Sequence, residues 1–326
     1  MSTVPACIVF EGSSIADDKQ HEDLREQGLA PTDLTPSTVG GRPRGRTVRE
    51  QGLAPTDPNP SSVGGRPRGR MMREQESAPV TVPLVFLHGI GGRASGWAPI
   101  QQACAAAGYS SLAWDMPGYG DSALIEPCHF DALADALAAL MDAHGLQKAV
   151  LVGHSLGGMV TLQMWARHPE RVAGLVLAAS SPAFGHGSGD FQQAFIAQRL
   201  APLEAGQSMA DVAQKLIPTM VAPGYNGPGL AQAQACMGSI TPAAYKAALG
   251  ALVQFEQRAT LPTITVPTLC IAGEHDRTAA PSVVQRMAKK IPNAQYQCLA
   301  GVGHLLTFEQ PDSFTQALLP FLRSIP

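Results

Sequence analysis

The chain lacks a hydrophobic run long enough to cross a membrane and lacks an excess of either charge. Charged residues make up 15% of its 326 residues, and the formal net charge is −3. A membrane helix needs about 18 consecutive apolar residues, and no such run is present. The N-terminus also lacks the basic stretch followed by an apolar one that marks a secretion signal. We therefore expect a cytoplasmic protein that binds neither membranes nor nucleic acid.

Paired cysteines and metal-ligand spacings are also missing. The six cysteines show no paired spacing, and Cys270 and Cys298 fall inside predicted buried strands, so we expect reduced thiols in the core. The histidines outside the motifs discussed below show no ligand spacing among themselves. We expect no metal and no cofactor.

Size and apolar content are sufficient for one large core. Apolar residues make up 45% of the 326 residues. A chain of this size and composition fits a single α/β domain built on one sheet. We assign that domain to residues 80–326.

The first 79 residues carry a tandem repeat in place of a core-forming pattern. Residues 25–48 and 49–72 agree at 19 of 24 positions, and each copy contains Arg-Pro-Arg-Gly-Arg. Abundant proline, glycine and charge with few large apolar residues predict disorder over residues 1–79. Nucleic-acid binding by the basic repeat is the less favoured interpretation, because acidic residues balance the basic ones and no aromatic residues alternate with them. We also hypothesise that translation starts at Met71 or Met72.

A serine stands between two glycines at the junction of two sequence patterns. At Gly153-His-Ser-Leu-Gly157, a β-branched strand pattern gives way to a helical one. This is the signature of a nucleophile elbow, a sharp, strained turn that exposes the serine between a strand and a helix. The pentapeptide alone is a weak signal, and its context makes it strong. Ser155 is therefore the candidate nucleophile.

Other strand patterns end in residues that could serve this serine. The run Pro83–Leu87 leads into the glycine-rich loop His88–Gly92, whose backbone N–H groups could face a developing oxyanion. Two later strand patterns end before Asp276 and His304. Because the carboxyl ends of parallel strands lie along one edge of a sheet, we expect these side chains to converge on Ser155. Glu274 is the alternative acid.

The order Ser, Asp, His is that of α/β-hydrolases, and the chain from about Val80 to Pro326 resembles this superfamily. The resemblance rests on the motifs His88–Gly92, Trp114–Ser122, Gly153–Gly157, Gly273–Asp276 and Gly301–His304. Residues 221–292 and 303–311 are most similar to bacterial carboxylesterases and 3-oxoadipate enol-lactonases. The resemblance implies an α/β fold with a mostly parallel, doubly wound sheet and a helical cap inserted before the acid-bearing strand.

The resemblance also implies roles for the candidate residues. His304 would take the proton of Ser155, and Asp276, which lies at the family's spacing after the strand, would orient the imidazole. The amides of Ile90 and Leu156 would form the oxyanion hole. An acyl-enzyme would form and water would release the acid.

Residues 182–262 turn helical and less regular, which predicts the cap. A lid there would cover Ser155 and shape an acyl pocket. The candidate substrate-binding residues are Trp97, Phe191, Phe195, Met220 and Met237. The alternative, that these residues only pack the cap and the core, is at least as favoured. Few aromatic and charged residues in the cap favour a small or moderately apolar acyl group.

These observations lead to one favoured function and several alternatives. We expect a cofactor-free serine hydrolase of a small ester or lactone, an enol-lactone being the most specific version. The alternatives are a carbon-carbon bond hydrolase or a perhydrolase on the same residues, and a small-molecule receptor without turnover.

Overall fold

The computed structural model describes residues 7–11, 82–184 and 189–326. Its strands form one seven-stranded sheet in the order β1-β3-β2-β4-β5-β6-β7. The strands are β1 Cys7–Phe10, β2 Leu84–Leu87, β3 Ser111–Trp114, β4 Ala149–His154, β5 Val172–Ala178, β6 Thr268–Gly273 and β7 Gln295–Leu299. All neighbouring pairs from β3 to β7 are parallel, and β1 is antiparallel to β3. The predicted mostly parallel α/β fold is confirmed.

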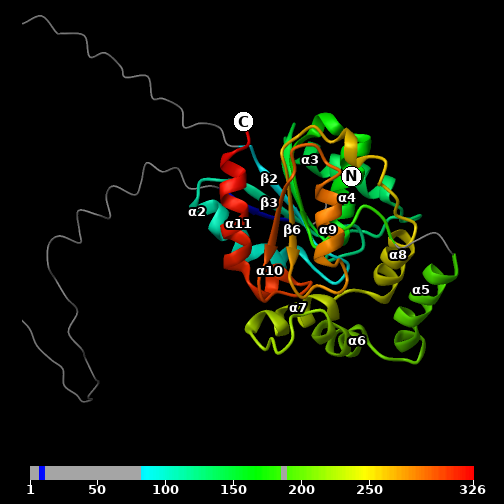
Figure 1. Ribbon diagram of the computed structural model, residues 1–326. Coiled ribbons are helices and arrows are strands. Elements are labelled where there is room, and N and C mark those ends of the chain that lie inside the picture. Colours follow the sequence, from blue (N-terminus) through cyan, green and yellow to red (C-terminus); the bar gives the residue numbers. More distant parts are fainter. Residues whose placement is uncertain (1–6, 12–81, 185–188) are drawn as a thin grey trace, which may run out of the picture. The chain divides into compact units, whose positions relative to one another are not determined.

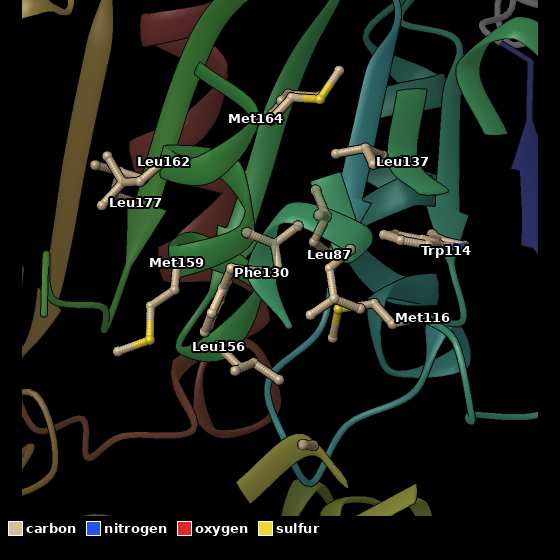
Figure 2. Packing of buried hydrophobic residues seen from close by; sticks show 14 of the residues in the cluster. Leu87, Trp114, Met116, Phe130, Leu137, Leu156, Met159, Leu162, Met164 and Leu177 are labelled. Atoms are coloured by element: carbon tan, nitrogen blue, oxygen red, sulfur yellow. The ribbon is translucent and has the colours of Figure 1, made fainter. Parts of the chain in front are cut away.

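Helices cover both faces of this sheet, which is why β2, β3, β4 and β6 are buried along their whole length. On one face lie α2 Ala98–Ala106 and α11 Pro311–Arg323, which pack against β2, β4 and β6. On the other lie α3 Phe130–Ala143, α4 Leu156–Arg167 and α9 Pro281–Ala288 (Figure 1). Figure 2 shows this second core, where Leu156 and Met159 of α4 lie among Leu87, Phe130 and Leu177. The sheet is thus the middle of three layers.

The strand order places one crevice at the carboxyl ends of β2 and β4. These two strands are neighbours, but the chain leaves β2 for β3 on one side and leaves β4 for β5 on the other. In such sheets the diverging connections open a crevice where ligands bind. The loop after β2 and the turn after β4 both lie at this point.

The N-terminal strand corrects one prediction. Cys7 lies opposite Trp114 in the β1–β3 register, and the Gln101 side-chain amide donates to the Ile8 carbonyl oxygen at 3.2 Å. The prediction that residues 1–79 lack regular structure is therefore wrong for Cys7–Phe10. This short segment is apolar and β-branched, and an average over the whole extension hides it. The tandem repeat and Met71 lie outside the described residues.

Between β5 and β6 the chain leaves the sheet and forms a group of helices, in the segment where the sequence predicts a cap. These are α5 Gly189–Glu204, α6 Met209–Leu216, α7 Pro228–Gly238 and α8 Pro242–Leu252, with the short 3₁₀ turns η4 Ile217–Thr219 and η5 Leu261–Thr263. Figure 1 shows α5 to α8 gathered on one side of the sheet domain. The remaining short elements are η2 Ala94–Trp97, η3 Pro169–Arg171 and α10 Leu306–Glu309.

Two smaller observations concern membranes and thiols. Within the described ranges, every helix is too short or too polar to span a lipid bilayer. Cys270 is buried as predicted, but Cys298 is exposed. The prediction for Cys298 is wrong because β7 is the last strand of the sheet and exposes much of its length.

Candidate functional site

Ser155 occupies a strained turn between β4 and α4. Its backbone has φ 52° and ψ −114°, values that side chains rarely permit, and its N–H donates to the Ala178 carbonyl at 2.9 Å. A Cβ atom added to Gly153 would lie 2.5 Å from the Gly157 backbone, and one added to Gly157 would lie 2.2 Å from the Leu87 carbonyl oxygen. Both flanking glycines are therefore required, and the strained turn exposes the serine hydroxyl at the sheet edge.

A continuous chain of hydrogen bonds joins the three candidate catalytic side chains. His304 Nε2 lies 3.0 Å from Ser155 Oγ, and His304 Nδ1 lies 2.8 Å from Asp276 Oδ2. The other Asp276 oxygen accepts from the N–H groups of Thr278 and Ala279 at 2.7 and 2.9 Å. Burial raises the pKa of Asp276, but the neighbouring His304 and these N–H groups outweigh it, so the pKa lies below its usual value. Asp276 can orient His304 as an anion.

Glu274, the alternative acid, lies elsewhere. Its side chain is exposed, accepts from the Gly301 N–H at 2.8 Å and lies 3.8 Å from His275 Nε2. Of the two acids considered, the structure brings only Asp276 to His304.

The glycine-rich loop after β2 lies against Ser155. A Cβ atom added to Gly89 would be 3.2 Å from the Ser155 Cβ, so the loop passes beside the nucleophile. The Ile90 carbonyl accepts from the Tyr119 hydroxyl at 2.9 Å. Leu156 is the first residue of α4, and an α-helix leaves this N–H without an intrahelical partner. The loop and the helix start thus place the Ile90 and Leu156 amides on the Ser155 side of the crevice, as an oxyanion hole needs.

Two buried histidines support the site without facing the reacting atoms. His88 Nδ1 donates to the Gly89 carbonyl at 2.8 Å, and its Nε2 accepts from the Met116 N–H at 3.2 Å. His154 Nε2 donates to the His304 carbonyl at 2.8 Å. Each ring therefore braces a backbone segment as a neutral group. Burial lowers the pKa of His88 to about 4; burial and the nearby His304 lower that of His154 to about 3.

These two pKa values predict a loss of stability in acid. Between about pH 6.5 and the folded-state values, the unfolded chain binds more protons than the folded one, so the free energy of unfolding falls as pH falls. We expect a loss of about 3 kcal/mol for each histidine between pH 7 and pH 4. Urea unfolding followed by tryptophan fluorescence measures it. His154→Gln should remove its own share and the exposed His275→Gln should not; equal stability at both pH values would contradict the assignment.

Sequence reasoning missed one buried carboxylate, Glu309. One of its oxygens accepts from the N–H groups of Gly303 and Ala222 at 2.9 and 2.7 Å, and the other accepts from Leu305 at 3.0 Å. Glu309 thus holds both neighbours of His304 and ties them to the cap. The His304 N–H also donates to a cap carbonyl, that of Met220, at 2.7 Å. Only the position of Glu309 five residues after His304 was visible in the sequence.

Replacing Glu309 with glutamine should weaken both the fold and the site. The amide keeps one acceptor oxygen, so its NH₂ group must face an N–H donor that the carboxylate now satisfies. We expect a loss of about 2 to 3 kcal/mol in unfolding free energy and a fall in kcat of about tenfold, because His304 is less well positioned. Denaturant titration and steady-state kinetics measure the two effects. The exposed Asp312→Asn is the matched control; equal behaviour of the two variants would contradict this role.

A cavity of about 870 Å³ opens over Ser155 and His304. All five predicted substrate-binding residues line it, namely Trp97, Phe191, Phe195, Met220 and Met237. Trp97 is also a core residue, because it is 2% exposed and its ring packs 4.9 Å from Phe86. Phe191 is 52% exposed at the rim. The lining is otherwise largely apolar, which suits the acyl part of a small substrate.

Two further side chains were correctly interpreted as structural. Asp115 forms a two-point ion pair with Arg93 at 2.9 and 3.0 Å and accepts from the Ala94 N–H at 2.8 Å. It therefore fixes the start of η2. Across the three described ranges, no group of three His, Cys, Asp or Glu side chains is placed to hold a metal ion.

Comparisons with known proteins agree with this geometry. Residues 82–311 match the family described as alpha/beta hydrolase fold. The putative carbamate hydrolase RutD of Caulobacter vibrioides (strain NA1000 / CB15N) is 30% identical over 239 residues, covering 72% of this chain and 87% of that protein. A thermophilic esterase from Thermogutta terrifontis superposes with a TM-score of 0.68 at 26% identity, covering 75% of this chain and 90% of the esterase. The enol-lactonase from Burkholderia xenovorans LB400 gives 0.66 at 26% identity, with 74% and 92% covered.

Proposed function

The chain belongs to the alpha/beta hydrolase fold family and is a hydrolase; on that premise we propose that it cleaves a small carboxylic ester or lactone through an acyl-enzyme on Ser155. The observation that carries the proposal is the unbroken hydrogen-bond chain from Asp276 through His304 to Ser155, which ends in a largely apolar cavity. The esterase and the enol-lactonase with similar structures support the choice of bond.

The first half of the reaction forms the acyl-enzyme. His304 Nε2 takes the hydroxyl proton as Ser155 Oγ attacks the acyl carbon. The Ile90 and Leu156 N–H groups stabilise the oxyanion, and Asp276 stabilises the imidazolium. When the tetrahedral intermediate collapses, the proton on His304 passes to the leaving alkoxide, which departs as the alcohol or, in a lactone, stays attached to the acyl chain.

The second half repeats these steps with water. His304 takes a proton from the water as its oxygen attacks the acyl carbon, and the proton then returns to Ser155 Oγ as the carboxylic acid is released. The cap residues that line the cavity decide which acyl group enters. No step requires a group other than the side chains and amides named here.

A carbamate is the second candidate substrate, because a relative that is 30% identical carries that name. Its carbonyl would be attacked by the same serine. Carbon-carbon bond hydrolysis, perhydrolysis and ligand binding without turnover use the same scaffold and are separated from ester hydrolysis by the assay below.

A substrate panel tests the proposal. The purified chain is assayed on p-nitrophenyl esters of two to eight carbons, on γ-lactones and on alkyl carbamates, with Ser155→Ala as the blank. We expect hydrolysis of short esters or lactones that disappears in the blank. Activity confined to carbamates would favour the second candidate. A folded wild type that hydrolyses none of these compounds would contradict the proposal.

A further inference from the structure

The cavity over Ser155 is lined by positive charges without negative ones. Its cationic residues are Arg93, Arg199, Arg258, Arg277, Arg286 and Lys290. Within the described part of the chain, no aspartate or glutamate lines it. This differs from the chain as a whole, whose formal net charge is −3. The positive charge is therefore concentrated at the site.

Two of these cations have protein partners. Arg93 pairs with Asp115 at 2.9 Å, and Arg258 pairs with Glu256. The other four form no ion pair with any carboxylate in residues 82–184 and 189–326. Their charges face the cavity without compensation, so a ligand that enters with a negative charge would meet no repulsion and several attractions.

The arrangement on α9 is specific to one helix face. Arg286 and Lys290 are four residues apart, and Val283 and Met287, on the same face, also line the cavity. Like charges at this spacing destabilise a helix. The helix dipole favours basic residues near the C-terminal end of α9, but it does not require that they face the cavity. A bound anion would offset the repulsion between them.

Arg199 approaches the cavity from α5 in the cap. It is half-buried, and its guanidinium carbon lies 5.2 Å from the centroid of the Phe195 ring. A guanidinium held over an aromatic ring is fixed in orientation and less hydrated than an exposed lysine, which suits it to bind a carboxylate or phosphate. Cations thus reach the cavity from both the sheet domain and the cap.

We propose that the substrate is an anionic ester or lactone, whose second acidic group, a carboxylate, is bound at the cavity by Arg286, Lys290 and Arg199 while its scissile carbonyl lies at Ser155. This inference rests on the proposed function and deepens it by naming the substrate class. The apolar lining between the cations and Ser155 takes the carbon chain that joins the two ends. A neutral ester of the same length would lose the attraction but keep the apolar contacts.

Paired esters of one diacid isolate the charge. The purified chain is assayed by proton release on monomethyl and dimethyl esters of succinic, glutaric, adipic and suberic acid, at low and high NaCl. We expect kcat/KM for at least one monomethyl ester to exceed that of its dimethyl ester by about five- to tenfold at low salt. The ratio should fall as salt screens the charges. A ratio of one or less across the series would overturn the inference while leaving the proposed function standing.

Two variants with equal charge changes per residue locate the effect. In Arg286→Gln/Lys290→Gln, the ratio of monomethyl to dimethyl ester should fall toward one. Lys289→Gln, an exposed neighbour at the end of the same helix that does not line the cavity, should keep the wild-type ratio. An unchanged ratio in the double variant would also overturn the inference.

Binding separates this inference from the function itself. Calorimetry with Ser155→Ala and each ester measures affinity without turnover. Tighter binding of the monomethyl ester with no hydrolysis by the wild type would uphold the anion site and contradict the hydrolase mechanism. Hydrolysis of both esters with equal affinity would do the reverse. Inorganic phosphate, added as a competitor, tests whether the cations bind a phosphate as well as a carboxylate.

Discussion

Ser155→Ala is expected to lower kcat on the best ester or lactone by about 10⁴- to 10⁶-fold, the range seen when a nucleophile of this kind is removed. Alanine lacks the oxygen that lies 3.0 Å from His304 Nε2, so no acyl-enzyme can form. Any remaining rate would come from substrate binding and the oxyanion hole acting on water. Steady-state kinetics and labelling by a fluorophosphonate, which should modify only the wild type at Ser155, measure the loss.

Ser181→Ala is the matched control for this result. Ser181 also lines the cavity, but its hydroxyl donates to the Ala183 carbonyl at 2.8 Å and has no contact with His304. It should keep nearly full activity. The thermal midpoint of Ser155→Ala should match that of the wild type, because alanine adds no atoms to the turn. A Ser155→Ala enzyme with normal turnover would show that another group attacks the substrate.

The nucleophile turn could be predicted from the sequence because its requirements are local. Gly153 and Gly157 stand within two residues of Ser155, and the contacts that exclude a side chain there involve the turn itself and β2 directly beside it. Asp276 and His304 could be found as well, since each follows a strand whose carboxyl end must lie at the same sheet edge. Local pattern and one rule of topology were enough for these three residues.

Glu309 could not be found in this way, because its role depends on three N–H groups that only the fold brings together. Ala222 lies in the cap, far from Gly303 and Leu305 in the sequence, and no periodic pattern links them. The cations at the cavity are a similar case. Arg286 and Lys290 have helical spacing, but Arg199 belongs to a distant helix, and the absence of carboxylates opposite them is a property of the folded site.

The strand Cys7–Phe10 shows the limit of composition. It is four residues long within an extension rich in proline, glycine and charge, and the antiparallel partner that stabilises it lies about a hundred residues away. An isolated strand of this length has no stability of its own, so only pairing with β3 gives it structure. Residue averages cannot detect such pairing.

Asp276→Asn is expected to lower kcat by about 10³- to 10⁴-fold. The Oδ1 position of Asp276 accepts from the Thr278 and Ala279 N–H groups, so the asparagine must place its carbonyl oxygen there. Its NH₂ group then faces His304 Nδ1 and donates to it. In that tautomer His304 Nε2 carries the hydrogen and points it toward Ser155 Oγ, so the imidazole cannot accept the serine proton.

Glu274→Gln provides the comparison that decides between the two acids. It changes the same charge two residues away, but its side chain is exposed and bonds the Gly301 N–H, so activity should stay near that of the wild type. Steady-state kinetics on one substrate, with both variants checked for folding, give the ratio. KM should change little in Asp276→Asn, since the loss is in the transition state. A large loss in Glu274→Gln with normal activity in Asp276→Asn would transfer the role of the acid to Glu274, and the hydrogen bond from Asp276 to His304 would then only hold the loop in place.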